Sequence, residues 1–259
     1  MNKCSRAFAS AISLSAFTAL TVAPRAAHAQ REIGYIEHVP RESPQHWELE
    51  LRFSPYSPRI DDEPGLKGTP YKDTFGTMKR LLFSLELDYQ ALRIPYVGAL
   101  GPGLSVGYTQ MTDSSFRTNG TRSTEDTDLS LYPFYGVAVL RLDEAWRRAG
   151  VPLVPYGKLG LGYTIWKISN PGGTATVTDA AGNVTKGFGG TWGVHGAVGL
   201  QFAMDVLDRG AVRNLDTAVG INHTYLFAEY YWSELSGIGQ SHPLRVGDRT
   251  WALGLSFEF

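Results

Sequence analysis

The stretch WELELRFS, residues 47–54, alternates between large apolar and polar side chains. One set holds Trp47, Leu49, Leu51 and Phe53, and the other holds Glu48, Glu50 and Arg52. Because successive side chains of a β-strand point to opposite faces, the pattern predicts a strand with one apolar face and one charged face. The fold then depends on which of the two faces is enclosed.

The same alternation recurs in seven further segments. They span residues 80–93, 103–110, 127–141, 153–166, 191–205, 224–232 and 249–259. Most are longer than the usual globular strand of about 5 to 6 residues and are long enough to cross a bilayer when tilted. The chain therefore contains about eight long strands.

We assign the facing of two of these segments by residue; only the second of them, residues 224–232, is aromatic on both faces and needs an explicit choice. In residues 127–141 we place Leu129, Leu131, Tyr135, Val137 and Val139 on the face shared with the other apolar rows. In residues 224–232 we place Leu226, Ala228, Tyr230 and Trp232 there, which leaves Glu229 on the opposite face.

The connections between the strands alternate in length. Those after the first, third, fifth and seventh strands are long and polar, at residues 54–79, 111–126, 169–190 and 233–248. The others are shorter and carry turn residues. Long loops at one end and short turns at the other, with an even number of strands, are the plan of an outer-membrane barrel.

Two barrel architectures fit the alternation. A lipocalin-like soluble barrel would enclose the large apolar residues around a ligand. A transmembrane barrel would turn them toward lipid. Here the other face is mostly Gly, Ala, Ser and Thr with isolated charges, which suits a cramped interior, and aromatic residues lie near strand ends as they do at membrane interfaces. We therefore predict an all-β, transmembrane, antiparallel up-and-down barrel with long extracellular loops and shorter periplasmic turns.

The N-terminus predicts export. Lys3 and Arg6 precede an apolar stretch and the small-residue site Ala27-His28-Ala29, the layout of a secretory signal peptide. We expect a signal peptide at residues 1–29, a periplasmic segment at 30–45 and the barrel at 46–259, exported through the Sec pathway. The single cysteine lies in the signal, and 21 basic residues then face 25 acidic ones, which gives no hint of a nucleic-acid partner.

The final residues, ALGLSFEF, carry a resemblance. With Gly254, Phe257 and Phe259 they resemble the terminal signal that hands Gram-negative outer-membrane barrels to their assembly machinery. The whole plan is similar to small barrels of the OmpA and OmpW type over essentially all of the mature chain. Phrases such as RLLFSLELDYQALRIPYVG also resemble a myxobacterial outer-membrane β-barrel family that has no assigned activity.

That resemblance implies a location and a set of partners. We expect an integral protein of the outer membrane that contacts lipid and lipopolysaccharide, is inserted by the barrel-assembly machinery and remains a monomer. It implies no cofactor.

Charged residues occupy the face that we place inside the barrel. They are Glu48, Glu50, Arg52, Glu86, Asp88, Lys158, His195, Asp205, Glu229 and Glu258. A charge facing lipid near mid-membrane would cost about 2 to 4 kcal/mol, so the interior is their natural place. The favoured interpretation is a salt-bridged plug, because buried charges must be paired.

Two other interpretations stay open. In one, Arg52 and Lys158 face the acidic residues across a narrow water path, and the protein is a channel for small or hydrophobic solutes. In the other, His195, Glu229 and either Ser233 or Ser256 serve a lipid A-modifying enzyme. Zinc-ligand spacing, a phosphate loop and a dinucleotide motif are absent from the sequence, so we expect no metal site. A non-enzymatic structural or surface-interaction role is the first expectation.

Overall fold

The computed structural model describes residues 46–116, 122–178, 182–207, 218–240 and 244–259. The predicted signal peptide and the predicted periplasmic segment lie outside the described residues and stay predictions. Within the described part, no helix combines the length and the apolarity needed to span a membrane.

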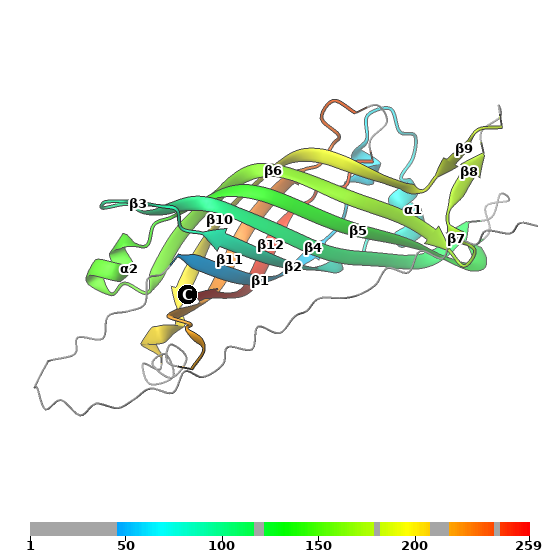
Figure 1. The fold of residues 1–259 in the computed structure, drawn as a ribbon. Helices are drawn as coiled ribbons and strands as arrows, with labels where there is room; N and C mark the ends of the chain where they lie inside the picture. The colour runs from blue at the N-terminus through cyan, green and yellow to red at the C-terminus, as the bar shows by residue number, and fades with distance from the viewer. Residues whose placement is uncertain (1–45, 117–121, 179–181, 208–217, 241–243) are drawn as a thin grey trace, which may run out of the picture. The chain divides into compact units, whose positions relative to one another are not determined.

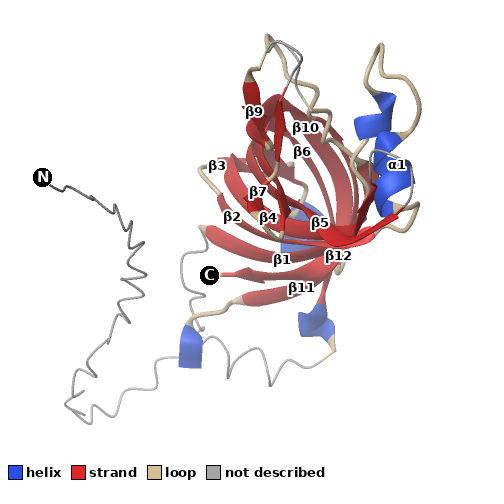
Figure 2. Ribbon diagram, turned by 90° about the vertical axis from the view of Figure 1, so that its right-hand side faces the viewer, coloured by secondary structure: helices blue, strands red, loops and turns tan. Residues whose placement is uncertain are grey.

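Eight long strands of the described chain close into one antiparallel barrel (Figures 1 and 2). Each strand pairs with the next one around the barrel, and the last pairs with the first, where Glu48 lies opposite Glu258. This closed sheet confirms the predicted all-β barrel. The strands are β1 (Trp47–Tyr56), β2 (Arg80–Tyr89), β4 (Gly98–Phe116), β5 (Arg122–Arg141), β6 (Leu153–Asn170), β10 (Phe188–Ala203), β11 (His223–Glu234) and β12 (Arg249–Glu258).

The two ends of the barrel differ. The end at which β1 begins and β12 ends, here called the turn end, carries β3 (Leu92–Ile94), α2 (Glu144–Ala149) and η2 (Met204–Val206). The opposite end, here called the loop end, carries η1 (Ile60–Asp62), α1 (Pro70–Phe75), β7 (Gly173–Thr174) and the hairpin of β8 (Thr176–Thr178) and β9 (Val184–Lys186). In Figure 1, α1, β8 and β9 lie at one end of the sheet, and α2, β3 and the C-terminus lie at the other.

Two of the predicted long loops are wrong in extent. The strands β4 and β5 continue through most of residues 111–126, and β6 and β10 enter residues 169–190 from both sides. The extra length is polar, yet it pairs across the strands, and the Thr112 hydroxyl donates to Asp128 at 2.5 Å. Ladder hydrogen bonds and such cross-strand pairs extend a hairpin without an apolar face.

The apolar rows point outward, as predicted, on seven of the eight strands. Leu104, Leu159 and Trp251 are 67%, 66% and 61% exposed, whereas inward neighbours such as Glu48 and Glu86 are at most 1% exposed. The choice made for the seventh strand, β11, is confirmed, because Leu226 is exposed and Glu229 is fully buried.

The facing predicted for β5 is wrong. Tyr132, Phe134 and Leu140 point outward, and the five residues placed on the lipid face, Leu129, Leu131, Tyr135, Val137 and Val139, are all buried inside the barrel. The reason is a second interior layer at the loop end that is apolar rather than charged. We call it the apolar plug; it consists of Tyr56, Tyr71, Phe75, Leu82, Met111, Leu129, Leu131, Tyr135, Val137, Val139, Leu235 and Val246.

The helix α1 belongs to this plug. Its buried residues, Tyr71 and Phe75, pack against each other with ring centroids 5.5 Å apart and join the apolar side chains of the barrel wall. The loop before β12 adds Val246, whose carbonyl accepts a hydrogen bond from the Tyr56 hydroxyl. Apolar side chains of the protein therefore occupy the interior of the barrel toward its loop end.

Candidate functional site

The turn half of the barrel interior holds buried charged side chains from six strands. Each side chain points inward because it shares the period-two phase of its strand's enclosed face. All the members are at most 5% exposed. We call this set the lumen charge network; it consists of Glu48, Glu50, Arg52, Glu86, Asp88, Arg141, Lys158, Glu229 and Glu258.

Two cations sit at the centre of the network. The Arg52 guanidinium contacts Glu86 and Glu229 and lies 3.8 Å from Glu50. The Lys158 ammonium donates to Glu50 Oε2 at 2.6 Å, contacts Glu86 and lies 3.9 Å from Glu229. These contacts join β1, β2, β6 and β11 across the lumen, so the two cations hold separate walls of the barrel together.

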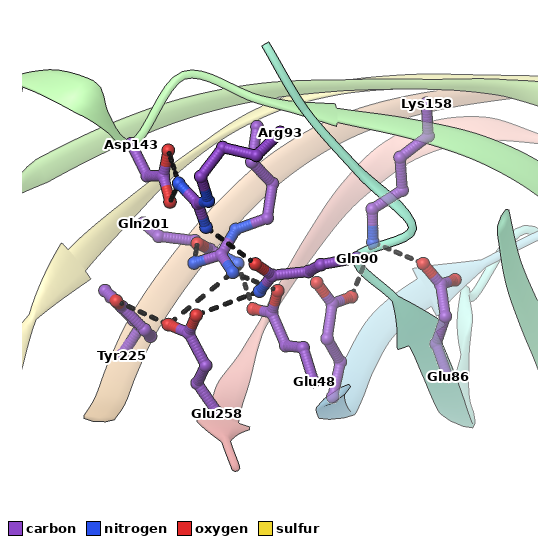
Figure 3. A network of polar contacts seen from close by, with 11 residues as sticks. Glu48, Glu86, Gln90, Arg93, Asp143, Lys158, Gln201, Tyr225 and Glu258 are labelled. Atoms are coloured by element: carbon purple, nitrogen blue, oxygen red, sulfur yellow. Dashed lines mark hydrogen bonds and ion pairs between the residues drawn. The ribbon is translucent and has the colours of Figure 1, made fainter. Parts of the chain in front are cut away.

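A second layer surrounds Arg141, nearer the turn end. Arg141 Nη1 lies 2.8 Å from Glu48 and 3.6 Å from Glu258, and its Nη2 donates to Gln201 at 2.9 Å. Gln201 in turn donates to Glu48 at 2.6 Å. Figure 3 shows Gln201, Tyr225 and Gln90 gathered around the carboxylates of Glu48 and Glu258.

The sequence interpretation missed Arg141. Its neighbour at two positions back, Val139, is buried on the same face of β5, so a correct facing of this strand would have placed Arg141 inside. Arg141 was therefore missed for the same reason that the facing of β5 was predicted wrongly. Asp205, also expected inside, is buried in η2 at the turn end, where it contacts the His223 ring.

His195 is buried directly opposite Ser233 in the β10–β11 pairing, but it forms no hydrogen bond with that serine or with another candidate catalytic group. Its ring stacks on Tyr135 with centroids 4.1 Å apart and lies 5.7 Å from the ring of Tyr231. Among the described residues, neither ring nitrogen has a hydrogen-bond partner. The Ser233 hydroxyl donates to the Tyr135 hydroxyl at 3.3 Å instead. In the described part of the chain, these groups are not hydrogen-bonded as a nucleophile, base and acid.

The lumen charge network contains more carboxyl groups than permanent cations. Its six carboxyl groups come from Glu48, Glu50, Glu86, Asp88, Glu229 and Glu258, and its permanent cations are Arg52, Arg141 and Lys158. Five of the carboxyl groups contact at least one of these cations within 4 Å. Asp88 is the sixth, and neither of its oxygens has a hydrogen-bond partner among the described residues.

The exterior of the barrel is an apolar band bordered by aromatic pairs. Neighbouring strands bring ring centroids within 4.5–5.3 Å of each other at Trp47–Tyr89, Tyr108–Tyr132, Tyr163–Trp192 and Tyr230–Trp251. A closed sheet satisfies its backbone hydrogen bonds internally, and an apolar band with aromatic girdles is the surface that outer-membrane barrels turn toward lipid. The protein is a membrane-spanning barrel of the outer-membrane type.

The three residues of the predicted assembly signal lie at the seam of the barrel. Gly254 lies on the inward face of β12 (Arg249–Glu258), and Phe257 and Phe259 lie on the outward face at its C-terminal end. Phe259 exchanges two backbone hydrogen bonds with Trp47, both at 2.9 Å. Their role in assembly stays a prediction.

Comparison with known proteins adds solved structures of low similarity. No protein-family model and no curated protein matches the chain. The chain is similar to Ail, the attachment invasion locus protein of Yersinia pestis, at 18% identity over 83% of this chain and 97% of that one, with a TM-score of 0.38. It is also similar to the N-terminal β-barrel domain of Pseudomonas aeruginosa OprF, at 12% identity over 83% and 100% of the two chains, with a TM-score of 0.34. The fold itself rests on the strand pairing described above.

Proposed function

We propose that this protein is a sealed outer-membrane barrel with a structural or surface-interaction role, and that it neither transports solutes nor catalyses a reaction. The observation that carries the proposal is the filled interior. The apolar plug occupies the loop half, and the lumen charge network occupies the turn half. The surfaces left for function are the loop end and the lipid-facing exterior.

Ionic contacts across the lumen support closure. The interior of an eight-stranded barrel is just wide enough for side chains to fill. Arg52 and Lys158 each contact carboxylates from several strands, and their side chains are at most 6% exposed. Removing one partner of such a pair leaves a buried charge uncompensated, which costs about 3 to 5 kcal/mol, so the cations and carboxylates that cross the lumen depend on one another.

Ordered structure at the loop end supports a surface role. Asp61 accepts the backbone N–H groups of Tyr71 at 2.8 Å and Lys72 at 3.1 Å, which fixes the start of α1. Arg59 lies 2.7 Å from Asp62 and 2.9 Å from Glu234, and its hydrogen bond lowers the pKa of the Asp62 carboxyl. A loop held in this way presents a preformed surface, which reduces the entropy cost of binding. Lipopolysaccharide and other envelope components are the proposed partners.

Conductance in planar bilayers tests the sealed lumen. We expect the folded wild-type protein to give no steady conductance, and Arg148→Glu, on the exposed face of α2, serves as the matched control for charge reversal. A defined wild-type conductance that falls on Arg52→Glu or Lys158→Glu would establish a channel instead. Folding of each variant is checked by the gel shift described in the Discussion.

Analysis of lipid A tests the enzymatic alternative. We expect lipid A from cells that produce the protein to match lipid A from cells without it. A modified lipid A that disappears with His195→Ala, in a variant that still folds, would show that the barrel is an enzyme.

A further inference from the structure

We propose that the lumen binds a hard cation of the calcium type between the carboxylates of Glu48, Glu50 and Asp88. The inference is independent of the proposed surface role. It rests on the position of the three carboxylates, on the unpartnered state of Asp88 and on the charge balance of the network.

The three carboxylates converge from two adjacent strands. Glu48 and Glu50 are successive inward residues of β1, and Asp88 on β2 is the direct cross-strand partner of Glu48. One oxygen from each of the three lies within 4.8 Å of the others, and all three residues are buried. Two oxygens that bind one calcium ion at about 2.3 to 2.6 Å each can be separated by up to about 5 Å, so the spacing fits.

The state of the Asp88 side chain is the strongest argument for a bound ligand. It is 3% exposed, and neither carboxylate oxygen has a hydrogen-bond partner among the described residues. A buried charge without a partner is costly, and like charges directly opposite each other across two strands destabilise a sheet. The wall also leaves room for this carboxylate, because a Cβ atom at Gly103 would lie 2.1 Å from Asp88 Oδ1. A bound cation would relieve both costs.

The other two ligands remain able to bind an ion. Glu48 contacts Arg141 and Gln201, and Glu50 contacts Lys158. An ionised carboxylate offers about four lone-pair sites, so each can accept these contacts and still bind a cation. A small cavity beside Asp88, lined in part by Gly101 and Val139, has room for about one water molecule.

The excess of carboxyl groups favours a divalent ion. The network holds six carboxyl groups and three permanent cations, and Arg141 already contacts two carboxylates and Lys158 three. A divalent cation would let two further carboxyl groups stay ionised without a cation from the protein. An all-oxygen ligand set selects a hard ion such as calcium over zinc or copper. Sequence spacing gave no sign of the site because its ligands come from two strands that a long loop separates.

Calcium titration of the purified, folded barrel tests the site. The protein is stripped with EDTA in a nonionic detergent, which removes phosphate headgroups as a competing source of binding, and is then titrated with calcium chloride in a calorimeter. We expect one saturable site and a thermal unfolding midpoint that is higher with calcium than with EDTA. An unchanged midpoint together with the absence of binding heat would overturn the proposal.

Two variants assign the binding to the lumen. Asp88→Asn keeps the shape of the side chain and should abolish both the heat and the shift in the midpoint. Asp126→Asn, at an exposed position on the extended β4–β5 hairpin, should retain both. A calcium response that survives Asp88→Asn unchanged would place the ion elsewhere and overturn the assignment.

Terbium luminescence provides a test that needs no variant. Terbium replaces calcium at oxygen sites and is sensitised by nearby tyrosine and tryptophan rings, and the Tyr156 ring lies 5.0 Å from the Lys158 ammonium in the same lumen. We expect a sensitised signal from the folded wild-type barrel that calcium displaces. Without a calcium-displaceable signal, the proposal fails even if Asp88→Asn does not fold.

Discussion

Arg141 shows at the scale of one residue what the charge network does. It lies between Glu48 and Glu258 and is 2% exposed, so its charge has no access to bulk water. The two carboxylates face each other across the β1–β12 seam and would repel each other without it. Arg141 therefore stabilises the join at which the sheet closes.

Replacing Arg141 by methionine should destabilise the barrel strongly. Arg141→Met leaves two buried carboxylates uncompensated, and we expect the free energy of unfolding to fall by about 3 to 5 kcal/mol. Denaturant titration in lipid vesicles measures the change. Arg148→Met, on the solvent-exposed side of α2, loses an exposed ion pair with Glu144 and should stay within about 1 kcal/mol of the wild type. A loss for Arg141→Met as small as that of the control would show that Arg141 does not support the seam.

The capping of α1 illustrates the scale of a single element. A helix of six residues is too short to be stable by itself, so it depends on its contacts. Asp61 supplies two of these contacts by accepting the N–H groups of Tyr71 and Lys72. The acidic run Asp61-Asp62-Glu63 thus contributes to local structure through Asp61 at α1 and through Asp62, which pairs with Arg59.

Asp61→Ala should loosen α1 without unfolding the barrel. Loss of a capping carboxylate costs about 0.5 to 2 kcal/mol of local stability. We expect faster hydrogen exchange at residues 70–75 and unchanged exchange in β1 and β2. Lys67→Ala, an exposed position in the same loop, is the control. Equal exchange rates in both variants would contradict the role of Asp61.

The outward face of β6 tests the membrane position of the strands. Leu159 is 66% exposed and lies between the aromatic pair at Tyr163 and the turn end, so an arginine there would face the hydrocarbon. We expect Leu159→Arg to lower the unfolding free energy in vesicles by about 2 to 4 kcal/mol. Leu66→Arg, in the loop before α1, should have little effect. Equal effects of the two substitutions would argue against a lipid-facing β6.

Element facing was predictable from sequence wherever the two faces of a strand differ in polarity. β1 shows this, because Glu48 and Glu50 cannot share a face with Trp47. The facing of β5 was not predictable in the same way. Its inward residues near Leu131 belong to the apolar plug, so both faces of this strand are apolar. The alternation of side chains then does not tell which face lies inside the barrel. The three-dimensional pairing of Asp88 with Glu48 was likewise invisible, since register depends on the intervening loop.

At the scale of the whole molecule, closure of the sheet leaves the barrel without a free long edge. Each of the eight strands has two antiparallel neighbours, and the interior holds the apolar plug and the lumen charge network. Disrupting one part therefore exposes charges or backbone groups to lipid, which is costly. We expect the barrel to resist detergent as a single unit.

A gel shift and fractionation check this expectation. Without heating, the protein should migrate in dodecyl sulfate gels as a compact species, and boiling should shift it toward the position of the unfolded chain. It should also require detergent for release from the membrane fraction. Recovery of the folded protein in the soluble periplasmic fraction without detergent would contradict the assignment as a membrane barrel.

We expect the seam between β1 and β12 to be among the last parts of the barrel to form. Glu48 and Glu258, which are 210 positions apart in the chain, are direct partners there. Contacts between such distant residues carry a large loop-closure entropy and form late, because almost every other strand must be in place first. Until then the growing sheet has two unpaired edges that can join another chain. We therefore expect the barrel to be prone to aggregation during folding, until β12 pairs with β1 and no strand edge is left unpaired.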